Sequence, residues 1–127
     1  MHEKRIEIRW RDVDAYEHVN QAVYLTYLEE VLDDWFRSLL GNLWHYVAAR
    51  VSIDYRAELR LEDRVAVGSV RLERVGTKSI TARGEIRAPD GRLVAEAELV
   101  VVARDPETGE SRLLSDDERA AFEAAAD

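Results

Sequence analysis

One long amphipathic helix, predicted between Asn20 and Leu40, most constrains what this chain can fold into. Asn20 is a residue type that caps helix N-termini, and Gly41 stands where helices commonly end. Apolar side chains recur along the helix at three- and four-residue spacing: Tyr24, Leu25, Leu28, Val31, Leu32, Trp35, Phe36 and Leu39. At about 100° per residue they cover a stripe of roughly 140°, and a helix of this kind needs a sheet on which to lie.

Most of the remaining chain predicts β-strands joined by tight turns. Alternating apolar and polar residues predict strands over residues 4–10, 51–61, 64–75, 78–88 and 93–103. Turn-forming residues separate the later strands at 76–77, 89–91 and 105–109. Tight turns join antiparallel neighbours, so we expect an antiparallel sheet.

Two shorter helices are also predicted. Residues 42–50 predict a short second helix after Gly41. Ser115 and Glu118 match a capping box and predict a C-terminal helix that reaches about Ala125.

Three details of the strands are expected from their patterns. Ile6, Ile8 and Trp10 alternate with charged residues and should share the inner face. In residues 64–75 the apolar phase changes at Gly68-Ser69, which predicts a β-bulge there. Residues 99–102 are apolar on both faces, which predicts burial on both sides.

The predicted lengths fit one architecture. Strands of about 10 to 12 residues span roughly 35 Å, and a helix of about 20 residues spans roughly 30 Å. One twisted sheet can therefore curl along the whole helix, which is an α+β fold with a single central helix. We expect one domain over residues 1–127.

Composition excludes several classes of function. The chain has 127 residues, no cysteine and a formal net charge of -8. The missing cysteines exclude disulfides, thiolate metal sites and a thiol nucleophile, and the negative charge argues against nucleic-acid binding. No apolar run approaches the roughly 18 residues of a membrane span, and residues 1–10 carry no signal-peptide core, so we expect a cytoplasmic protein.

The loop and helix over residues 14–30, Asp-Ala-Tyr-Glu-His-Val-Asn-Gln-Ala-Val-Tyr-Leu-Thr-Tyr-Leu-Glu-Glu, carry a family resemblance. Residues 51–56, 76–79 and 105–109 support it. The chain resembles hotdog-fold acyl-CoA thioesterases of the 4-hydroxybenzoyl-CoA thioesterase type, and is most similar to the small bacterial long-chain acyl-CoA thioesterases. It departs from many relatives in three places, carrying Glu17 for Gly, Gln21 for Asn and Glu58 for Pro.

The resemblance implies a fold, an activity and an assembly. The fold is the hotdog fold, a five-stranded antiparallel sheet curled around one long helix, and the activity is hydrolysis of acyl-CoA to free acid and CoA. No cofactor is implied, because coenzyme A is part of the substrate. Relatives of this type form homodimers or homotetramers with active sites between subunits.

A carboxylate is the best candidate for the reacting group, because the chain has neither cysteine nor a serine in a nucleophile-elbow context. The resemblance makes Asp14 the catalytic residue, as general base or as nucleophile through a mixed anhydride. The alternative is a loop aspartate that favours the helix N-terminus. We rank Asp12, which should point the other way, as structural, and Glu29 on the helix is a rival because another branch of these enzymes carries its carboxylate there.

The oxyanion that forms during hydrolysis needs a donor, and N–H groups of the first helical turn are free for this role. The resemblance places that donor at the backbone N–H of Gln21. His18 and Asn20 are candidates for orienting water or the thioester, against the alternatives of a hydrogen-bonded loop histidine and an N-cap. Tyr24 is a candidate substrate contact, although its place on the apolar stripe favours the core.

Basic residues are candidates for binding the phosphates of coenzyme A. Arg71, Arg74 and Lys78 surround the Gly76 turn. In relatives the Lys-Ser pair at this turn approaches the nucleotide, so we expect contacts from Lys78 and, more weakly, Ser79. Arg56 is a lesser candidate, and a solvated hairpin tip is the alternative for the whole cluster.

Two other functions remain open on the same fold. A non-catalytic module could bind acyl-CoA or acyl-carrier protein without turnover. A hydratase or dehydratase would pair Asp and His about five residues apart, and Asp14 and His18 come within one residue of that spacing. His2 and His45 have no partners at ligand spacing, so no metal site is predicted.

Overall fold

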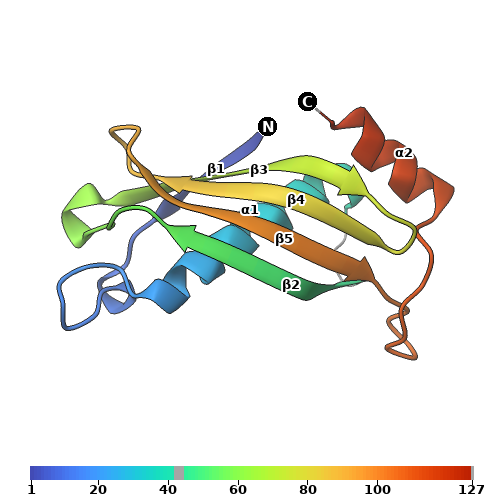
Figure 1. Cartoon of the computed structure of the whole chain (residues 1–127), viewed down its shortest axis with the longest axis horizontal. Coiled ribbons are helices and arrows are strands. Elements are labelled where there is room, and N and C mark those ends of the chain that lie inside the picture. The colour runs from blue at the N-terminus through green and yellow to red at the C-terminus, as the bar shows by residue number, and fades with distance from the viewer. Residues whose placement is uncertain (42–44, 127) are drawn as a thin grey trace.

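The computed structural model describes residues 1–41 and 45–126. The elements follow one another as β1 (His2–Glu7), a 3-10 turn (Trp10–Asp12), α1 (Gln21–Leu40), β2 (Tyr46–Tyr55), a second 3-10 turn (Leu61–Asp63), β3 (Val65–Val75), β4 (Ser79–Arg87), β5 (Leu93–Ala103) and α2 (Asp116–Ala124). Figure 1 shows α1 lying behind a sheet formed by all the strands.

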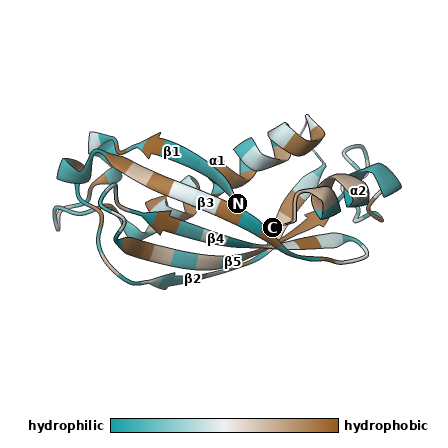
Figure 2. Ribbon diagram, turned by 90° about the horizontal axis from the view of Figure 1, so that it is seen from above, coloured by the Kyte–Doolittle hydropathy of each residue, from teal (hydrophilic) through white to brown (hydrophobic). Residues whose placement is uncertain are grey.

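The sheet has five strands in the order β1-β3-β4-β5-β2, and every neighbouring pair is antiparallel. Apolar and polar residues alternate along the strands (Figure 2). The helix packs mainly on β3, β1 and β4, so the inner face of β2 is less covered. This arrangement confirms the predicted α+β class and the hotdog fold.

Two glycines allow the close approach of α1 to the sheet. A Cβ atom at Gly68 on β3 would collide with the side chain of Val31. At Gly84 on β4 it would lie 2.8 Å from Cδ2 of Leu28. Both helix residues are completely buried, so the centre of the core depends on the absence of side chains at these two positions.

The predicted helix ends are confirmed. The side chain of Asn20 accepts a hydrogen bond from the Ala22 N–H at 2.9 Å, and Gly41 has the left-handed φ of 75° that ends the helix. Ser115 and Glu118 form the expected capping box at α2.

The predicted second helix is wrong for the described residues 45–50, while its residues 42–44 lie outside the described part of the chain. Strand β2 begins at Tyr46 and pairs with β5 as far as Tyr55, so residues 56–61 do not continue the strand. Tyr46 packs its ring against Phe36 and Phe122, with centroids 5.0 and 6.3 Å away. Contacts with distant residues therefore override the local helical spacing.

The predicted bulge at Gly68-Ser69 is also wrong. Ala66, Gly68, Val70 and Leu72 occupy the inner face without interruption, and the register between β3 and β4 shifts instead between Leu72 and Arg74. Gly68 holds an inner position because Val31 needs the space.

Two predictions about burial differ from the structure. Trp10 is 82% exposed, because the chain turns into a 3-10 segment after Ile8 and no longer follows the strand alternation. In residues 99–102 only Leu99 and Val101 are buried, whereas Val100 and Val102 face the other side of the sheet and are half-exposed in this chain.

Candidate active site

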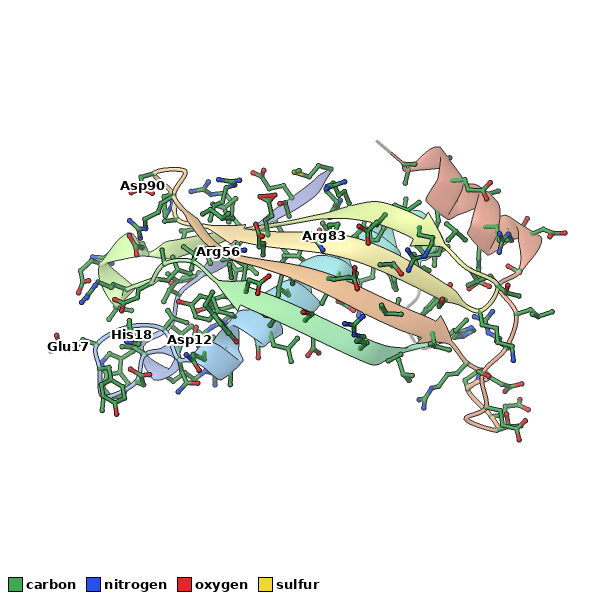
Figure 3. All side chains as sticks on the ribbon, viewed as in Figure 1. Asp12, Glu17, His18, Arg56, Arg83 and Asp90 are labelled. Atoms are coloured by element: carbon green, nitrogen blue, oxygen red, sulfur yellow. The ribbon has the colours of Figure 1, made fainter. Side chains whose placement is uncertain are left out.

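The loop before α1 is closed at its base by backbone pairing. Val13 and Val19 form an antiparallel bridge, and the Asn20 N–H donates to the Asp12 carbonyl at 2.9 Å. The Asp14 N–H donates to the His18 carbonyl at 3.0 Å. Asp14 and His18 are therefore held opposite each other immediately before the helix. The loop that carries them lies at the end of the sheet seen on the left of Figure 1, where Figure 3 labels His18.

Asp14 has one committed and one free carboxylate oxygen. Its Oδ1 accepts the Tyr16 N–H at 2.9 Å and lies 4.0 Å from Nδ1 of His18. No described residue donates to its Oδ2. The side chain is 21% exposed, so the free oxygen can meet a water or a thioester carbon.

His18 lies between two carboxylates. Its Nε2 is 3.8 Å from Oε1 of Glu58, opposite the contact with Asp14, and its ring stacks on Tyr16 with centroids 6.1 Å apart. Glu58 was not predicted as a site residue and was named only as a departure from relatives. The strand alternation that put it on the polar face was the available signal, but strand β2 has already ended there.

The first turn of α1 offers a free donor. Asn20 caps the Ala22 N–H, and no described residue accepts from the N–H of Gln21. The Gln21 carbonyl accepts the hydroxyl of Tyr55 at 3.1 Å. The free N–H and the positive end of the helix dipole suit a developing negative charge.

Tyr24 has the contacts of a core residue. It is 3% exposed, and its hydroxyl accepts the Leu59 N–H at 3.1 Å. The Leu59 carbonyl in turn accepts the Val19 N–H at 2.8 Å. Burial raises the pKa of the Tyr24 hydroxyl. Through Leu59, Tyr24 is connected to Val19 at the end of the loop.

Asp12 is buried and bonded, in agreement with its structural ranking. Its Oδ2 accepts the hydroxyl of Tyr27 at 2.7 Å and the Arg9 N–H at 3.0 Å. Burial, and next the bond to Asp12, raise the pKa of Tyr27. Tyr27 was not predicted in the buried stripe, although its three-residue spacing from Tyr24 was an available signal.

A hollow of about 330 Å³ adjoins Asp14. It is lined by Trp10, Val13, Asp14, Glu17, Leu61 and Glu62. Glu17 adopts a φ of 69°, a left-handed conformation that favours glycine. This chain therefore has a glutamate at a position whose backbone suits the glycine that many relatives carry.

The predicted phosphate contacts lie at the other end of the molecule. Lys78 and Ser79 follow the Gly76 turn beside α2, and β3 and β4 separate them from the Asp14 loop (Figure 1). Lys78 Nζ donates to Oγ of Ser111 at 3.3 Å. One chain therefore does not bring Lys78 and Asp14 into a single site.

Arg56 and Glu29, the two remaining candidates, do not contact Asp14 in this chain. Arg56 is near the Asp14 end (Figure 3), but its guanidinium lies 3.0 Å from Glu96 and 3.8 Å from Asp54. Glu29 is exposed at the rim of a hollow of about 260 Å³ between α1 and the start of β2. It lies about 12 Å along the helix from Gln21 at 1.5 Å per residue.

The described residues contain neither a metal-binding cluster nor a membrane-spanning helix. No three histidine or acidic side chains among them gather as metal ligands, and His2 bonds Asp34 at 2.7 Å. Neither described helix combines the length and apolar character that crossing a bilayer requires.

Comparison with known proteins gives consistent matches. Residues 8–122 match the family model described as the thioesterase-like superfamily. The chain is 28% identical over 125 residues to the long-chain acyl-CoA thioesterase FadM of Escherichia coli strain K12, covering 94% of this chain and 95% of that protein.

Two solved structures are similar over nearly the whole chain. A thioesterase from Thermus thermophilus, complexed with coenzyme A and Zn, has a TM-score of 0.89 and 28% identity, covering 97% of this chain and 92% of that one. A predicted thioesterase from Bacillus stearothermophilus has a TM-score of 0.90 with 23% identity, covering 98% and 95%, and bears on the fold alone.

Proposed function

Because the chain belongs to the thioesterase-like superfamily, we propose that it is an acyl-CoA thioesterase, which hydrolyses acyl-CoA to a free acid and CoA. The observation that carries the proposal is the junction of the loop with α1. There, Asp14 keeps an unbonded Oδ2 beside a helix end whose Gln21 N–H has no acceptor among the described residues.

Asp14 supplies the reacting carboxylate. As a general base, its Oδ2 takes a proton from water while the water oxygen attacks the thioester carbon; the C–S bond then breaks, and the departing CoA thiolate takes up the proton from Asp14. As a nucleophile, the same oxygen attacks the thioester carbon and expels the CoA thiolate, and water then hydrolyses the mixed anhydride to the free acid and restores the carboxylate. Both routes place a negative charge on the former carbonyl oxygen, and the Gln21 N–H donates to it; loss of one such donor typically costs about 10²–10³ in kcat.

His18 and Asn20 assist in different ways. The imidazole of His18, between Asp14 and Glu58, orients the attacking water or the thioester. Asn20 caps the Ala22 N–H and so fixes the first turn around the Gln21 donor. Tyr24 acts from the core, where its bond to the Leu59 N–H positions the residue whose carbonyl accepts the Val19 N–H.

A complete site requires a second copy of the chain. Lys78 and Ser79 stand at the opposite end from Asp14, so we assign the phosphate contacts to those residues of another subunit in a homodimer or homotetramer. Strand β2 is an edge of the sheet, and its inner residues Val51 and Ile53 are half-exposed while Tyr55 is 44% exposed. An unpaired edge with apolar residues beside it favours association with a second copy.

The experiment that tests the function measures free-thiol release from short, long and aromatic acyl-CoAs. Turnover by the wild type, lost in Asp14→Asn, would support hydrolysis and identify the acyl class. Tight acyl-CoA binding by calorimetry without turnover would favour the non-catalytic binding module. Hydration of a 2-enoyl thioester, detected by product analysis, would favour the hydratase.

A further inference from the structure

Asp12 is a buried charged residue at the entrance of the active-site loop. It is 8% exposed, whereas Trp10 two residues before it is 82% exposed. Its Oδ2 accepts two hydrogen bonds, from the Tyr27 hydroxyl at 2.7 Å and from the Arg9 N–H at 3.0 Å. A buried carboxylate is costly unless it is bonded in this way, so the two donors fix where Asp12 lies.

Tyr27 connects that carboxylate to the helix core. Its side chain is 1% exposed and lies in the second turn of α1, with its ring 6.5 Å from that of Tyr24. The hydroxyl is joined to a residue fifteen positions earlier in the chain. The bond therefore fixes the position of Asp12, where the loop begins, relative to α1.

The backbone of Asp12 extends the connection to the helix N-terminus. Its carbonyl accepts the Asn20 N–H at 2.9 Å, and its N–H donates to the Arg9 carbonyl at 2.9 Å. Asp14, two residues later, bonds its own carboxylate only within the loop, to the Tyr16 N–H. The position of Asp14 relative to the Gln21 N–H thus depends on Asp12 as well as on the backbone bonds that Asp14 makes within the loop.

We infer that Asp12 and Tyr27 form a positioning pair, which holds Asp14 and the Gln21 N–H in the geometry needed for hydrolysis. This inference rests on the proposed thioesterase function. Asp12 is not a second base, because its bonded oxygen is buried and it does not line the hollow beside Asp14. A misplacement of about 1 Å can cost about 10²-fold in rate, so a pair of this kind is visible in kinetics.

Tyr27→Phe tests the pair, and Tyr46→Phe is its matched control. Both changes delete a tyrosine hydroxyl that donates to a carboxylate, and Tyr46 bonds Glu118 at the far end of the molecule. We expect Tyr27→Phe to lower kcat about tenfold or more with KM changed less than about threefold. Tyr46→Phe should lower the melting temperature comparably and leave kcat unchanged.

Asp12→Asn distinguishes positioning from proton transfer. The amide oxygen can still accept both bonds, so we expect most of the activity to remain, whereas Asp14→Asn loses it. A loss in Asp12→Asn as large as in Asp14→Asn would overturn the inference. Wild-type kcat in Tyr27→Phe would overturn it as well.

Amide hydrogen exchange gives a readout independent of activity. Residues 13–21 should exchange at least about tenfold faster in Tyr27→Phe but not in Tyr46→Phe, because only the former releases the loop. Unchanged exchange in this segment would contradict the pair. If the wild type hydrolyses no thioester, the proposed function fails, and the exchange comparison still decides whether the pair holds the loop.

Discussion

Nδ1 of His18 lies 4.0 Å from Oδ1 of Asp14, and the carbonyl of His18 accepts the N–H of Asp14 at 3.0 Å. The backbone bond holds the two residues together across a loop closed by the Val13–Val19 bridge, while Nδ1 of His18 is nearer to the Val19 carbonyl, at 3.4 Å. Closure of the loop by this bridge brings residues 14 and 18 opposite each other, although they are four positions apart in the sequence.

Asp14→Asn should lower kcat by about 10²-fold or more while the protein stays folded. The amide oxygen can still accept the Tyr16 N–H, so the loop keeps its local bond, but the group can no longer act as base or nucleophile. Free-thiol release under saturating acyl-CoA measures kcat, and circular dichroism checks the fold. Glu29→Gln is the control, and full activity in Asp14→Asn with loss in Glu29→Gln would move the reaction to the helix.

Glu17→Gly should stabilise the protein by about 0.5–1 kcal/mol. A non-glycine residue in the left-handed conformation costs roughly 1–2 kcal/mol, and the greater freedom of glycine in the unfolded chain offsets part of the gain. The φ of Glu17 is 69°. Urea unfolding measures the difference in free energy.

Glu17→Gln separates the backbone effect from the charge. It removes one carboxylate from the rim of the hollow beside Asp14 but keeps the side-chain clash of the left-handed conformation. We expect no gain in stability from this variant. An equal gain in both variants would show that charge repulsion, and not backbone strain, destabilises the loop.

Features that depend on neighbours in sequence were predictable. The ends of α1 follow from Asn20 and Gly41, and both are confirmed because capping is decided within a few residues. The motif over residues 14–30 indicated the family, which the match over residues 8–122 confirms. The alternation of residues 78–88 placed Ile80 and Ile86 inside, where they are buried.

Features that depend on distant partners were not predictable in the same way. Gly68 was interpreted as a break in the strand pattern. In the structure its missing side chain leaves room for Val31 of α1, a contact that the strand sequence alone does not reveal. The Tyr27–Asp12 bond joins a helix to a loop and leaves no periodic signal. Whether Lys78 and Asp14 share a site depends on sheet topology and on assembly, which no local pattern encodes.

Lys78→Gln should raise KM for acyl-CoA about tenfold with little change in kcat. A charged contact with a phosphate is worth roughly 1.5 kcal/mol, which corresponds to about a tenfold change in affinity. The effect should disappear with an acyl-pantetheine thioester, which lacks the nucleotide phosphates. Measuring KM with both substrates distinguishes phosphate binding from a change in the reacting groups.

Lys4→Gln is the control for the loss of a lysine charge. Lys4 lies on β1 and is 3.8 Å from Asp34, away from the Gly76 turn. It should leave KM unchanged for both substrates. An unchanged KM in Lys78→Gln would contradict the phosphate contact and favour a solvated turn at the tip of β3 and β4.

Protonation of Glu118 in acid should make the protein less stable. Burial alone would raise its pKa, but bonds from Arg112, from the Ser115 N–H and from Tyr46 outweigh it and lower the pKa to about 2 from the ordinary value of 4.5. The pKa is lower in the folded state, so the stabilisation is fully present above about pH 4.5 and is lost as the pH falls through 2. Because the site is partly solvated, we expect a loss of about 1–2 kcal/mol.

Glu118→Gln should flatten this part of the pH dependence, because the amide does not titrate. It should also lower the stability at neutral pH, since Arg112 donates to both carboxylate oxygens, at 2.7 and 3.0 Å, and loses its charged partner. Glu123→Gln on the same helix is the control, because Glu123 is exposed. Urea unfolding between pH 2 and 7 measures the slopes, and an equal slope in wild type and Glu118→Gln would mean that other carboxylates cause the acid sensitivity.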